Sequence, residues 1–146
     1  MKNWHIFVLL TILVFPAFII AFESSADTGT KIIINDSVEA EAITRDDLKK
    51  IFLGKKVKWN SNQSIKIAVL KEGGIHENFL RTYIQKTSSQ FRYYWKKLLF
   101  TGKGIPPKSF TSEDEIINYV SSTVGAIGYA SSGIQKDGIK VITIKD

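Results

Sequence analysis

The chain has 146 residues, which suffice for one domain with a modest core, and it contains no cysteine. Disulfides, a lipid-modified cysteine and a cysteine nucleophile are therefore excluded. The formal net charge of +6 is concentrated between Lys49 and Lys108, where 14 lysines and arginines accompany only Glu72 and Glu77. Such a stretch is either a solvated surface or attracts an anion, an acidic partner or a membrane surface. No motif indicates binding to nucleic acid.

The first 26 residues predict a secretory signal peptide. Lys2 precedes an apolar run from Ile6 to Phe22, and small residues follow it up to Ala26. We expect cleavage after Ala26 and export of residues 27–146 to the periplasm as one domain. The alternative is an uncleaved membrane anchor, although the run is slightly short of the roughly 20 residues that span a bilayer.

Strands and helices are expected to alternate through the rest of the chain. Strands are predicted at 31–35, 64–70, 125–130 and 139–144, and helices at 44–54, 75–85, 89–101 and 111–122. Thr44 is a suitable N-cap for the first helix, and Ser112 with Glu115 fits a capping box for the last. The alternation predicts an α/β fold with a mainly parallel sheet flanked by helices.

The stretch from Ser89 to Pro107 is predicted to be the element around which the chain is organised. Its apolar residues have helical spacing and predict one broad buried stripe, formed by Phe91, Tyr94, Trp95, Leu98 and Leu99. The basic residues off this stripe are expected to face water: Arg92, Lys96 and Lys97. Ser88 or Ser89 is expected to cap the helix, and the rigid loop from Gly102 to Pro107 is a place for function.

The loop after the second predicted strand contains the best candidate site. Lys71, Gly73, Gly74 and His76 lie between a strand and a helix, an order that collects backbone N–H groups at the loop. Lys71 would attract an anion, and His76 would tune its binding with pH. Arg81, on the following helix, is a further candidate. The alternative interpretation is a tight turn whose side chains are simply solvated.

Catalysis has little support in the sequence. His76 is the only histidine beyond the predicted leader, and we find no nucleophile motif and no metal-ligand cluster. We therefore predict a protein that is not an enzyme and needs no cofactor or metal. The sequence Thr101-Gly102-Lys103 lacks the spacing of a P-loop. Ser131 and Ser132 either line a cleft or turn the chain.

Three segments resemble the phosphate-binding proteins of ABC transporters. They are Ile51-Phe52-Leu53-Gly54-Lys55 with Trp59-Asn60, then Gly125-Ala126-Ile127-Gly128-Tyr129, and Tyr94 to Gly104 with Pro106-Pro107. The last of these resembles a short branch of exported single-lobe proteins. The resemblance covers nearly all of the mature chain, and it implies one lobe of a type II periplasmic binding protein fold.

The resemblance also implies two alternative functions. Full-length relatives close two lobes on the anion, and their Arg-x-Asp-Gly-Ser-Gly-Thr loop is represented here by Lys71 to His76, which keeps a base and glycines without the hydroxyls. One function is to bind inorganic phosphate or a related anion, as the substrate-binding component of an ABC transporter. The other is a non-enzymatic module that docks a membrane sensor or another envelope protein. A homodimer would bring two lobes into one cleft.

Overall fold

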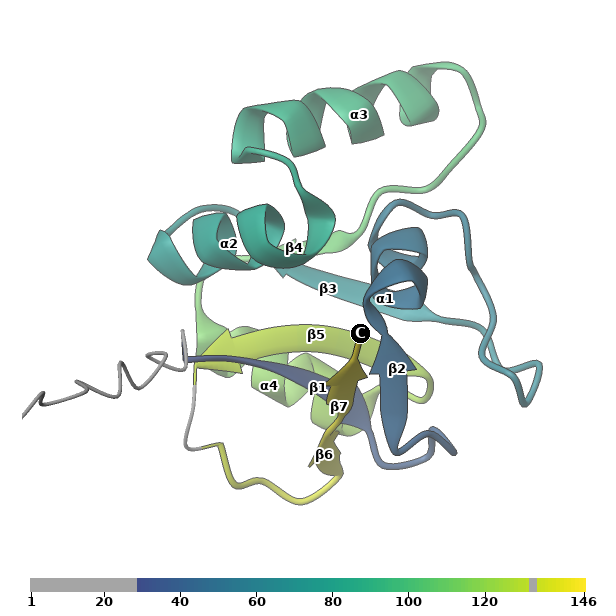
Figure 1. The fold of residues 1–146 in the computed structure, drawn as a ribbon, viewed down its shortest axis with the longest axis vertical. Coiled ribbons are helices and arrows are strands. Elements are labelled where there is room, and N and C mark those ends of the chain that lie inside the picture. Colours follow the sequence, from purple (N-terminus) through teal and green to yellow (C-terminus); the bar gives the residue numbers. More distant parts are fainter. Residues whose placement is uncertain (1–28, 132–133) are drawn as a thin grey trace, which may run out of the picture.

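Figure 1 shows the computed structural model, which describes residues 29–131 and 134–146. The predicted signal peptide and Ser132 lie outside the described residues. The strands are β1 (Thr30–Asn35), β2 (Ala42–Thr44), β3 (Lys66–Leu70), β4 (Lys108–Phe110), β5 (Ala126–Ser131), β6 (Ile139–Val141) and β7 (Thr143–Lys145). The helices are α1 (Arg45–Phe52), α2 (Gly74–Phe79), the π-helical η1 (Leu80–Ile84), α3 (Ser88–Phe100) and α4 (Glu113–Ser122). None of these helices is long and apolar enough to cross a bilayer.

Five strands form one sheet in the order β4-β3-β5-β1-β6. β3 is parallel to β4 and β5, whereas β1 is antiparallel to both β5 and β6. The predicted α/β fold is confirmed, and the sheet is mixed, because β1 alone runs against its neighbours. Alternation of strands and helices does not determine the direction of β1, since β5 lies between β1 and the next long strand, β3.

The short strands β2 and β4 were not predicted from the sequence, and one predicted strand is two strands in the structure. β2 and β4 have three residues each, which is too short for a period-2 pattern to be read from sequence. The predicted strand at 139–144 is split into β6 and β7 at Ile142. β7 leaves the main sheet and pairs in parallel with β2.

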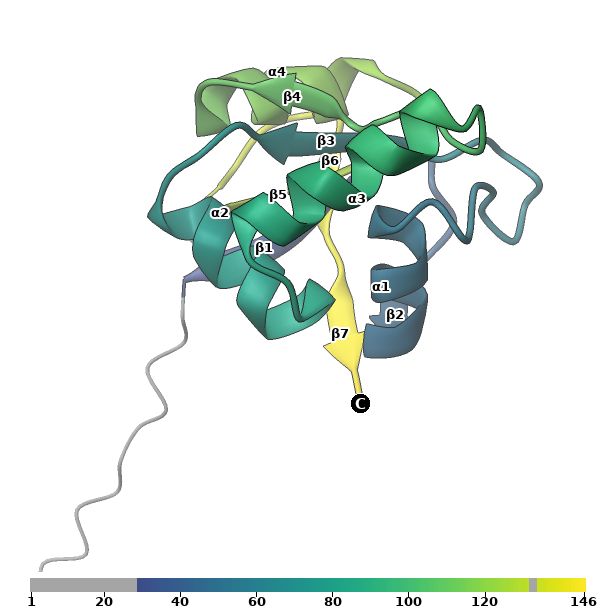
Figure 2. The same cartoon turned by 90° about the horizontal axis from the view of Figure 1, so that it is seen from above.

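Helices cover both faces of the main sheet. Successive side chains of a strand point to opposite faces, and β5 shows this directly. A Cβ placed on Gly128 would lie 2.8 Å from Ile116 of α4. The next residue, Tyr129, stacks on Phe79 of α2 with ring centroids 4.0 Å apart. Figure 2 accordingly shows α4 on the far side of the sheet from α2 and α3.

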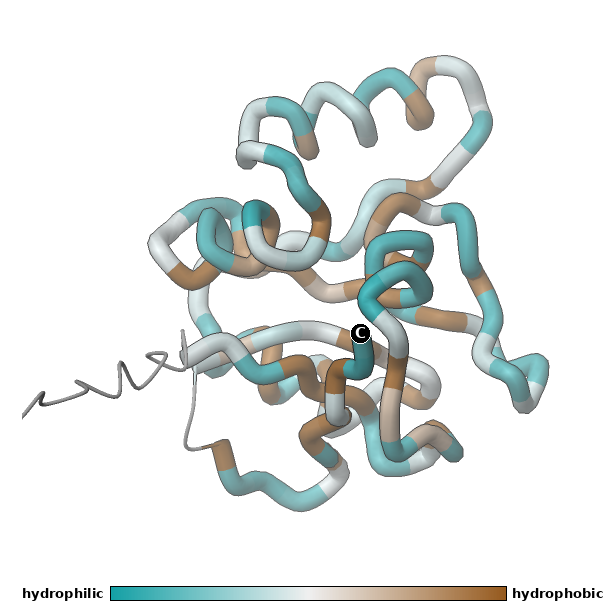
Figure 3. The backbone as a smooth tube through the Cα atoms, in the orientation of Figure 1, coloured by the Kyte–Doolittle hydropathy of each residue, from teal (hydrophilic) through white to brown (hydrophobic). Residues whose placement is uncertain are grey.

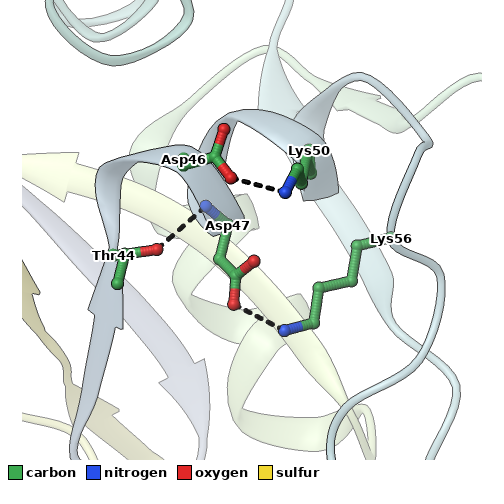
Figure 4. A network of polar contacts seen from close by, with 5 residues as sticks. All are labelled: Thr44, Asp46, Asp47, Lys50 and Lys56. Atoms are coloured by element: carbon green, nitrogen blue, oxygen red, sulfur yellow. Dashed lines mark hydrogen bonds and ion pairs between the residues drawn. The ribbon is translucent and has the colours of Figure 1, made fainter.

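The start of α1 follows the sequence prediction. The Thr44 hydroxyl accepts a hydrogen bond of 3.1 Å from the backbone N–H of Asp47, so the predicted N-cap is confirmed. Asp46 pairs with Lys50 at 2.5 Å, and the Asp47 carboxylate pairs with Lys56 at 2.7 Å (Figure 4). The Asp46–Lys50 pair lies within α1, is exposed and contributes little stability. The Asp47–Lys56 pair is partly buried and joins the first turn of α1 to the loop after the helix.

The centre of the core is a cluster around Tyr129, which we call the tyrosine hub. The Tyr129 ring is fully buried, stacks on Phe79 and lies 6.1 Å from Phe52 of α1 between ring centroids. Its hydroxyl accepts a hydrogen bond of 2.9 Å from the Leu70 N–H and lies 2.5 Å from Nδ1 of His76. One side chain of β5 therefore connects β3, α1 and α2. Figure 3 shows hydrophobic segments gathered in this layered part of the molecule.

The α3 helix lies outside these layers (Figure 1). Phe91 and Trp95 are each 4% exposed, but Leu99 is 54% and Phe100 77% exposed. The predicted stripe is therefore confirmed except at Leu99, since Tyr94 and Leu98 are half-buried against the core. The centre of the core lies at Tyr129 rather than on α3. The predicted cap is wrong: Thr87 forms a capping box with Gln90. The Ser88 hydroxyl instead donates a hydrogen bond to the Glu77 carboxylate.

The three segments that resemble phosphate-binding proteins contact one another. Trp59 Nε1 donates a hydrogen bond of 2.9 Å to the Gly125 carbonyl, and Trp95 Nε1 donates one of 3.2 Å to the Phe52 carbonyl. Gly125 has φ +78°, and a Cβ there would lie 2.3 Å from the Ser64 carbonyl oxygen, so only glycine fits. These segments build the scaffold.

Candidate functional site

A cavity of about 470 Å³ lies at the carboxyl end of β3, between that strand end and α3. It is lined by Val69, Leu70, Lys71, His76, Phe91, Arg92, Trp95, Lys96, Pro106, Pro107 and Ser109. The carboxyl ends of parallel strands are the usual place for ligands in open α/β sheets. β3 runs parallel to both of its neighbours, so the cavity lies at an edge of this kind.

Three cationic side chains surround the cavity, and we call them the basic rim: Lys71, Arg92 and Lys96. All three are exposed, and none of the lining residues is acidic. Hydrogen bonds from Thr111 are the main cause of the lowered pKa of Glu115, and Lys71 is close enough to add a small further lowering. Glu115 therefore offsets part of the Lys71 charge, while Arg92 and Lys96 have no carboxylate among the other lining residues.

His76 lies at the bottom of the cavity and is only 2% exposed. The Tyr129 hydroxyl accepts from the Leu70 N–H, so its own hydrogen is available for Nδ1 of His76. Nδ1 is then the acceptor, and the ring proton lies on Nε2. Burial lowers the pKa of His76, the Glu77 carboxylate opposes this shift, and Arg92 adds to it. His76 is therefore neutral at pH 7.

Aromatic rings and prolines form one side of the cavity, and we call this side the apolar wall: Phe91, Trp95, Pro106 and Pro107. Phe91 packs edge-on against His76, with ring centroids 6.3 Å apart, and against Trp95 at 6.4 Å. Trp95 is fixed by its hydrogen bond to the Phe52 carbonyl. The wall is consequently rigid, whereas the basic rim consists of long flexible side chains.

The loop from Thr101 to Pro107 separates this cavity from a second one of about 480 Å³. Trp95, Pro106 and Pro107 line both cavities. The second cavity is also rich in cations, with Lys56, Lys58, Lys66, Lys103 and Lys108 among its lining residues. Three of these are already engaged: Lys56 pairs with Asp47, Lys58 donates a hydrogen bond to Asn62, and Lys108 lies over the Tyr119 ring.

The structure brings together two of the five residues predicted for the site. Lys71 and His76 line the cavity, whereas Gly73, Gly74 and Arg81 do not. Both glycines are exposed, and a Cβ on either would have no neighbour within 4 Å. Arg81 is exposed on η1.

Sequence reasoning missed Arg92 and Lys96, which it expected to face water. Their signal was present: they are four residues apart, so they share one face of α3, and they directly follow Phe91 and Trp95, the two residues that bury the helix. A basic residue that directly follows a buried aromatic residue on a helix lies at the edge of the buried contact. Arg92 and Lys96 therefore lie at the edge of the cavity that Phe91 and Trp95 line.

The structure gives little support to a metal site or to a cleft at Ser131. In the part of the chain that the structure describes, no group of three or more His, Asp or Glu side chains could hold a metal ion. Ser131, at the end of β5, donates its backbone N–H to the Glu113 carboxylate. This contact joins the strand to the first turn of α4.

Comparison with solved structures places the fold. A protein from Clostridium perfringens, described as a phosphate ABC transporter substrate-binding protein and solved with bound phosphate, superposes with a TM-score of 0.63 at 15% identity over 80% of this chain and 44% of that one. PstS from Borrelia burgdorferi gives 0.60 at 22% identity over 80% and 47% of the two chains. This is the fold of one phosphate-binding-protein lobe.

An ABC-type phosphate transport receptor from Vibrio cholerae gives a TM-score of 0.52 at 20% identity and covers 80% of this chain and 46% of the receptor. The chain thus spans less than half the length of the structures it matches. No protein-family model and no curated protein sequence matches it. The predicted single lobe is confirmed, and the likeness is to proteins described as binding or transport receptors.

Proposed function

We propose that the protein is an exported, non-enzymatic domain that binds phosphate or a related oxyanion in the periplasm. One observation carries this proposal: three cationic side chains and no acidic one line a cavity at the carboxyl end of β3, on the fold of a phosphate-binding lobe. Residues 1–26 would direct export and then be removed.

The rim residues would supply complementary kinds of recognition. Arg92 offers a planar guanidinium that can hold two oxygens of one anion, whereas Lys71 and Lys96 act as flexible point charges. His76 would contribute its Nε2–H as a neutral donor. Because the cations are exposed and screened by salt, we expect binding that weakens as ionic strength rises.

A second protein surface would complete the site. The chain covers less than half the length of its structural neighbours and matches one lobe of them. The missing wall would come from a membrane transporter, a sensor protein or a second copy of this chain, since two single lobes can enclose one cleft. Association of this kind would raise the affinity above that of the isolated domain.

Calorimetric titration of the purified protein with phosphate, repeated with sulfate and at raised salt, tests the proposal. We expect saturable binding that Lys71→Glu abolishes and that Lys97→Glu leaves intact, because Lys97 is exposed on α3 but does not line the cavity. Absence of heat, or weak heat that sulfate reproduces and salt removes, would contradict phosphate binding.

A specific observation favours a second function, that of an interaction module. Four large apolar side chains are exposed on α3 and the loop after it: Tyr93 at 71%, Leu99 at 54%, Phe100 at 77% and Ile105 at 89%. Exposed apolar groups gathered on one element mark a contact surface. Cross-linking in the periplasm separates the two functions: a docking module loses its partner on Phe100→Ser and keeps it on Lys71→Glu.

A further inference from the structure

We propose that the cavity at the end of β3 takes an organic phosphate, in which a phosphate monoester is joined to a flat apolar group, rather than inorganic phosphate alone. This inference rests on the proposed oxyanion-binding function and names the ligand class of the same site. The inference follows from the way charged and buried apolar side chains are distributed within the cavity.

The cavity separates its charges from its apolar surface. Lys71, Arg92 and Lys96 are exposed at the rim, whereas Phe91 and Trp95 are each only 4% exposed and form the wall beneath them. A ligand that satisfies both parts must itself have a charged end and an apolar end. Inorganic phosphate would use the rim and the His76 donor and would leave the apolar wall uncovered, because its rings and prolines offer no hydrogen bonds to phosphate oxygens.

The dimensions of the cavity agree with this assignment. Its volume is about 470 Å³, within the range of roughly 300–1,000 Å³ that is usual for small-molecule sites. One water occupies roughly 30 Å³ in the liquid, so the cavity has room for a ring in addition to a single phosphorus and its oxygens. A loosely filled cavity would leave the apolar wall in contact with water.

The wall also has a geometry suited to a ring. His76, Phe91 and Trp95 follow one another edge to face, with centroid separations of 6.3 and 6.4 Å. Aromatic groups favour edge-to-face and offset contacts at such separations, so a flat ligand ring can continue the series. Its phosphate then lies at the rim, where Arg92 and Lys96 are one helical turn apart.

Titration of the purified protein with phenyl phosphate, inorganic phosphate and phenol tests the inference. We expect phenyl phosphate to bind about 10-fold or more tightly than inorganic phosphate, because the ring leaves water on binding. Phenol, which has no charge for the rim, should bind weakly. Inorganic phosphate should displace phenyl phosphate, since both use the same cations.

Two variants locate the site. Lys96→Glu should lower the affinity for phenyl phosphate about 10-fold or more. Lys97 is its neighbour on α3 and does not line the cavity, so Lys97→Glu should change this affinity less than about 2-fold. Both residues are exposed, so both variants should fold. Phe91→Leu, checked for folding by circular dichroism, should lower the ratio between the affinities for phenyl phosphate and inorganic phosphate, because only phenyl phosphate has a ring that packs on Phe91.

The outcomes are distinguishable. Equal affinity for phenyl phosphate and inorganic phosphate would overturn the inference and leave the oxyanion-binding function standing. Equal affinity for phenol and phenyl phosphate, or insensitivity to Lys96→Glu, would overturn it by removing the role of the rim. No binding of either phosphate would overturn both proposals. Binding of phenyl phosphate alone would support the inference and replace inorganic phosphate as the ligand.

Discussion

The tyrosine hub and the outer arm, as we call residues Ser88–Pro107, are built in opposite ways. In the hub, Tyr129 is fully buried and its ring and hydroxyl contact several elements. The outer arm is held to the rest of the molecule by one side of α3, with Phe91 and Trp95 buried and the Tyr94 hydroxyl donating to the Leu53 carbonyl. It exposes Phe100 and Ile105 to solvent. The hub therefore determines the fold, while the arm presents side chains to what lies outside.

This difference explains what the family-like segments contribute. Trp59, Gly125 and Tyr129 belong to the segments that resemble phosphate-binding proteins, and all three are buried in scaffold contacts. Of the cavity's three cations, Lys71 and Arg92 lie outside these segments, whereas Lys96 lies within the third of them, on the arm. A likeness carried mainly by scaffold residues establishes the lobe and leaves the ligand to be determined from the cavity itself.

Removing the Tyr129 hydroxyl should have the largest effect on folding. In Tyr129→Phe the Leu70 N–H loses its acceptor and the His76 ring loses its donor, and each buried polar group left alone costs about 1–3 kcal/mol. We expect the free energy of unfolding in urea to fall by about 2–6 kcal/mol.

Tyr93→Phe is the matched control, because Tyr93 is 71% exposed on the outer arm. Its free energy of unfolding should stay within about 0.5 kcal/mol of the unmodified protein. A loss below about 1 kcal/mol in Tyr129→Phe would contradict the central place given to the hub, since the two groups would then find other partners.

The connection between hub and arm passes through Gly54. This residue has φ +69°, and an added Cβ would lie 2.6 Å from Trp95 Cη2. Gly54→Ala combines a left-handed conformation, which costs roughly 1–2 kcal/mol, with displacement of a buried ring, which costs roughly 1–3 kcal/mol. We expect a lower free energy of unfolding and a shifted indole resonance of Trp95.

Gly102→Ala measures the cost of the left-handed backbone conformation alone, without the steric contact with Trp95. Gly102 has nearly the same φ, +67°, and nothing lies within 4 Å of its added Cβ. It should lose only roughly 1–2 kcal/mol and leave the Trp95 resonance in place. Equal losses in the two variants would show that the arm moves away from Gly54 without cost and is not fixed by Trp95.

The sequence was sufficient for local features such as β1 and the cap at Thr44, and insufficient for the hub and much of the site, for physical reasons. Strands such as β1 and capping residues such as Thr44 act locally, so their signals are visible in a few neighbouring residues. The direction of β1 and the burial of His76 depend on contacts with β5, about a hundred and about fifty residues away in sequence. Periodicity also placed Leu99 in the core, because it shows which residues share a helix face but not how wide the contact is.

A smaller effect is expected from pH, through His76. Burial lowers the pKa of this residue, so below about pH 6.5 the unfolded chain binds a proton that the folded protein does not. The free energy of unfolding should therefore fall as the pH drops from about 7.5 to 5.5, by at most about 1.4 kcal/mol per pH unit.

His76→Gln, which keeps an acceptor for the Tyr129 hydroxyl, should flatten this dependence. Glu77 and Glu115 have lowered pKa values, so they stay ionised in this range and do not contribute to it. Urea unfolding at several pH values measures the slope. A slope that persists unchanged in His76→Gln would assign it to another group.

The smallest effect on folding, and the sharpest test of where the site lies, comes from two arginines. Arg81 was predicted from sequence and lies on η1 outside the cavity, whereas Arg92 lines it on the outer arm. Both are exposed, so Arg81→Ala and Arg92→Ala should each change the free energy of unfolding by less than about 0.5 kcal/mol.

Their effects on anion affinity should differ, because only Arg92 can donate to an oxyanion held in the cavity. Loss of a charged hydrogen bond costs about 1.5–3 kcal/mol, so Arg92→Ala should lower the anion affinity about 10-fold or more. Arg81→Ala loses no such bond and should change the affinity less than about 2-fold. The gap should narrow at raised salt, since the rim is exposed to screening. If Arg81→Ala had the larger effect, the anion would lie at the α2–η1 side of the loop after β3, and the outer arm would be left with protein contacts as its function.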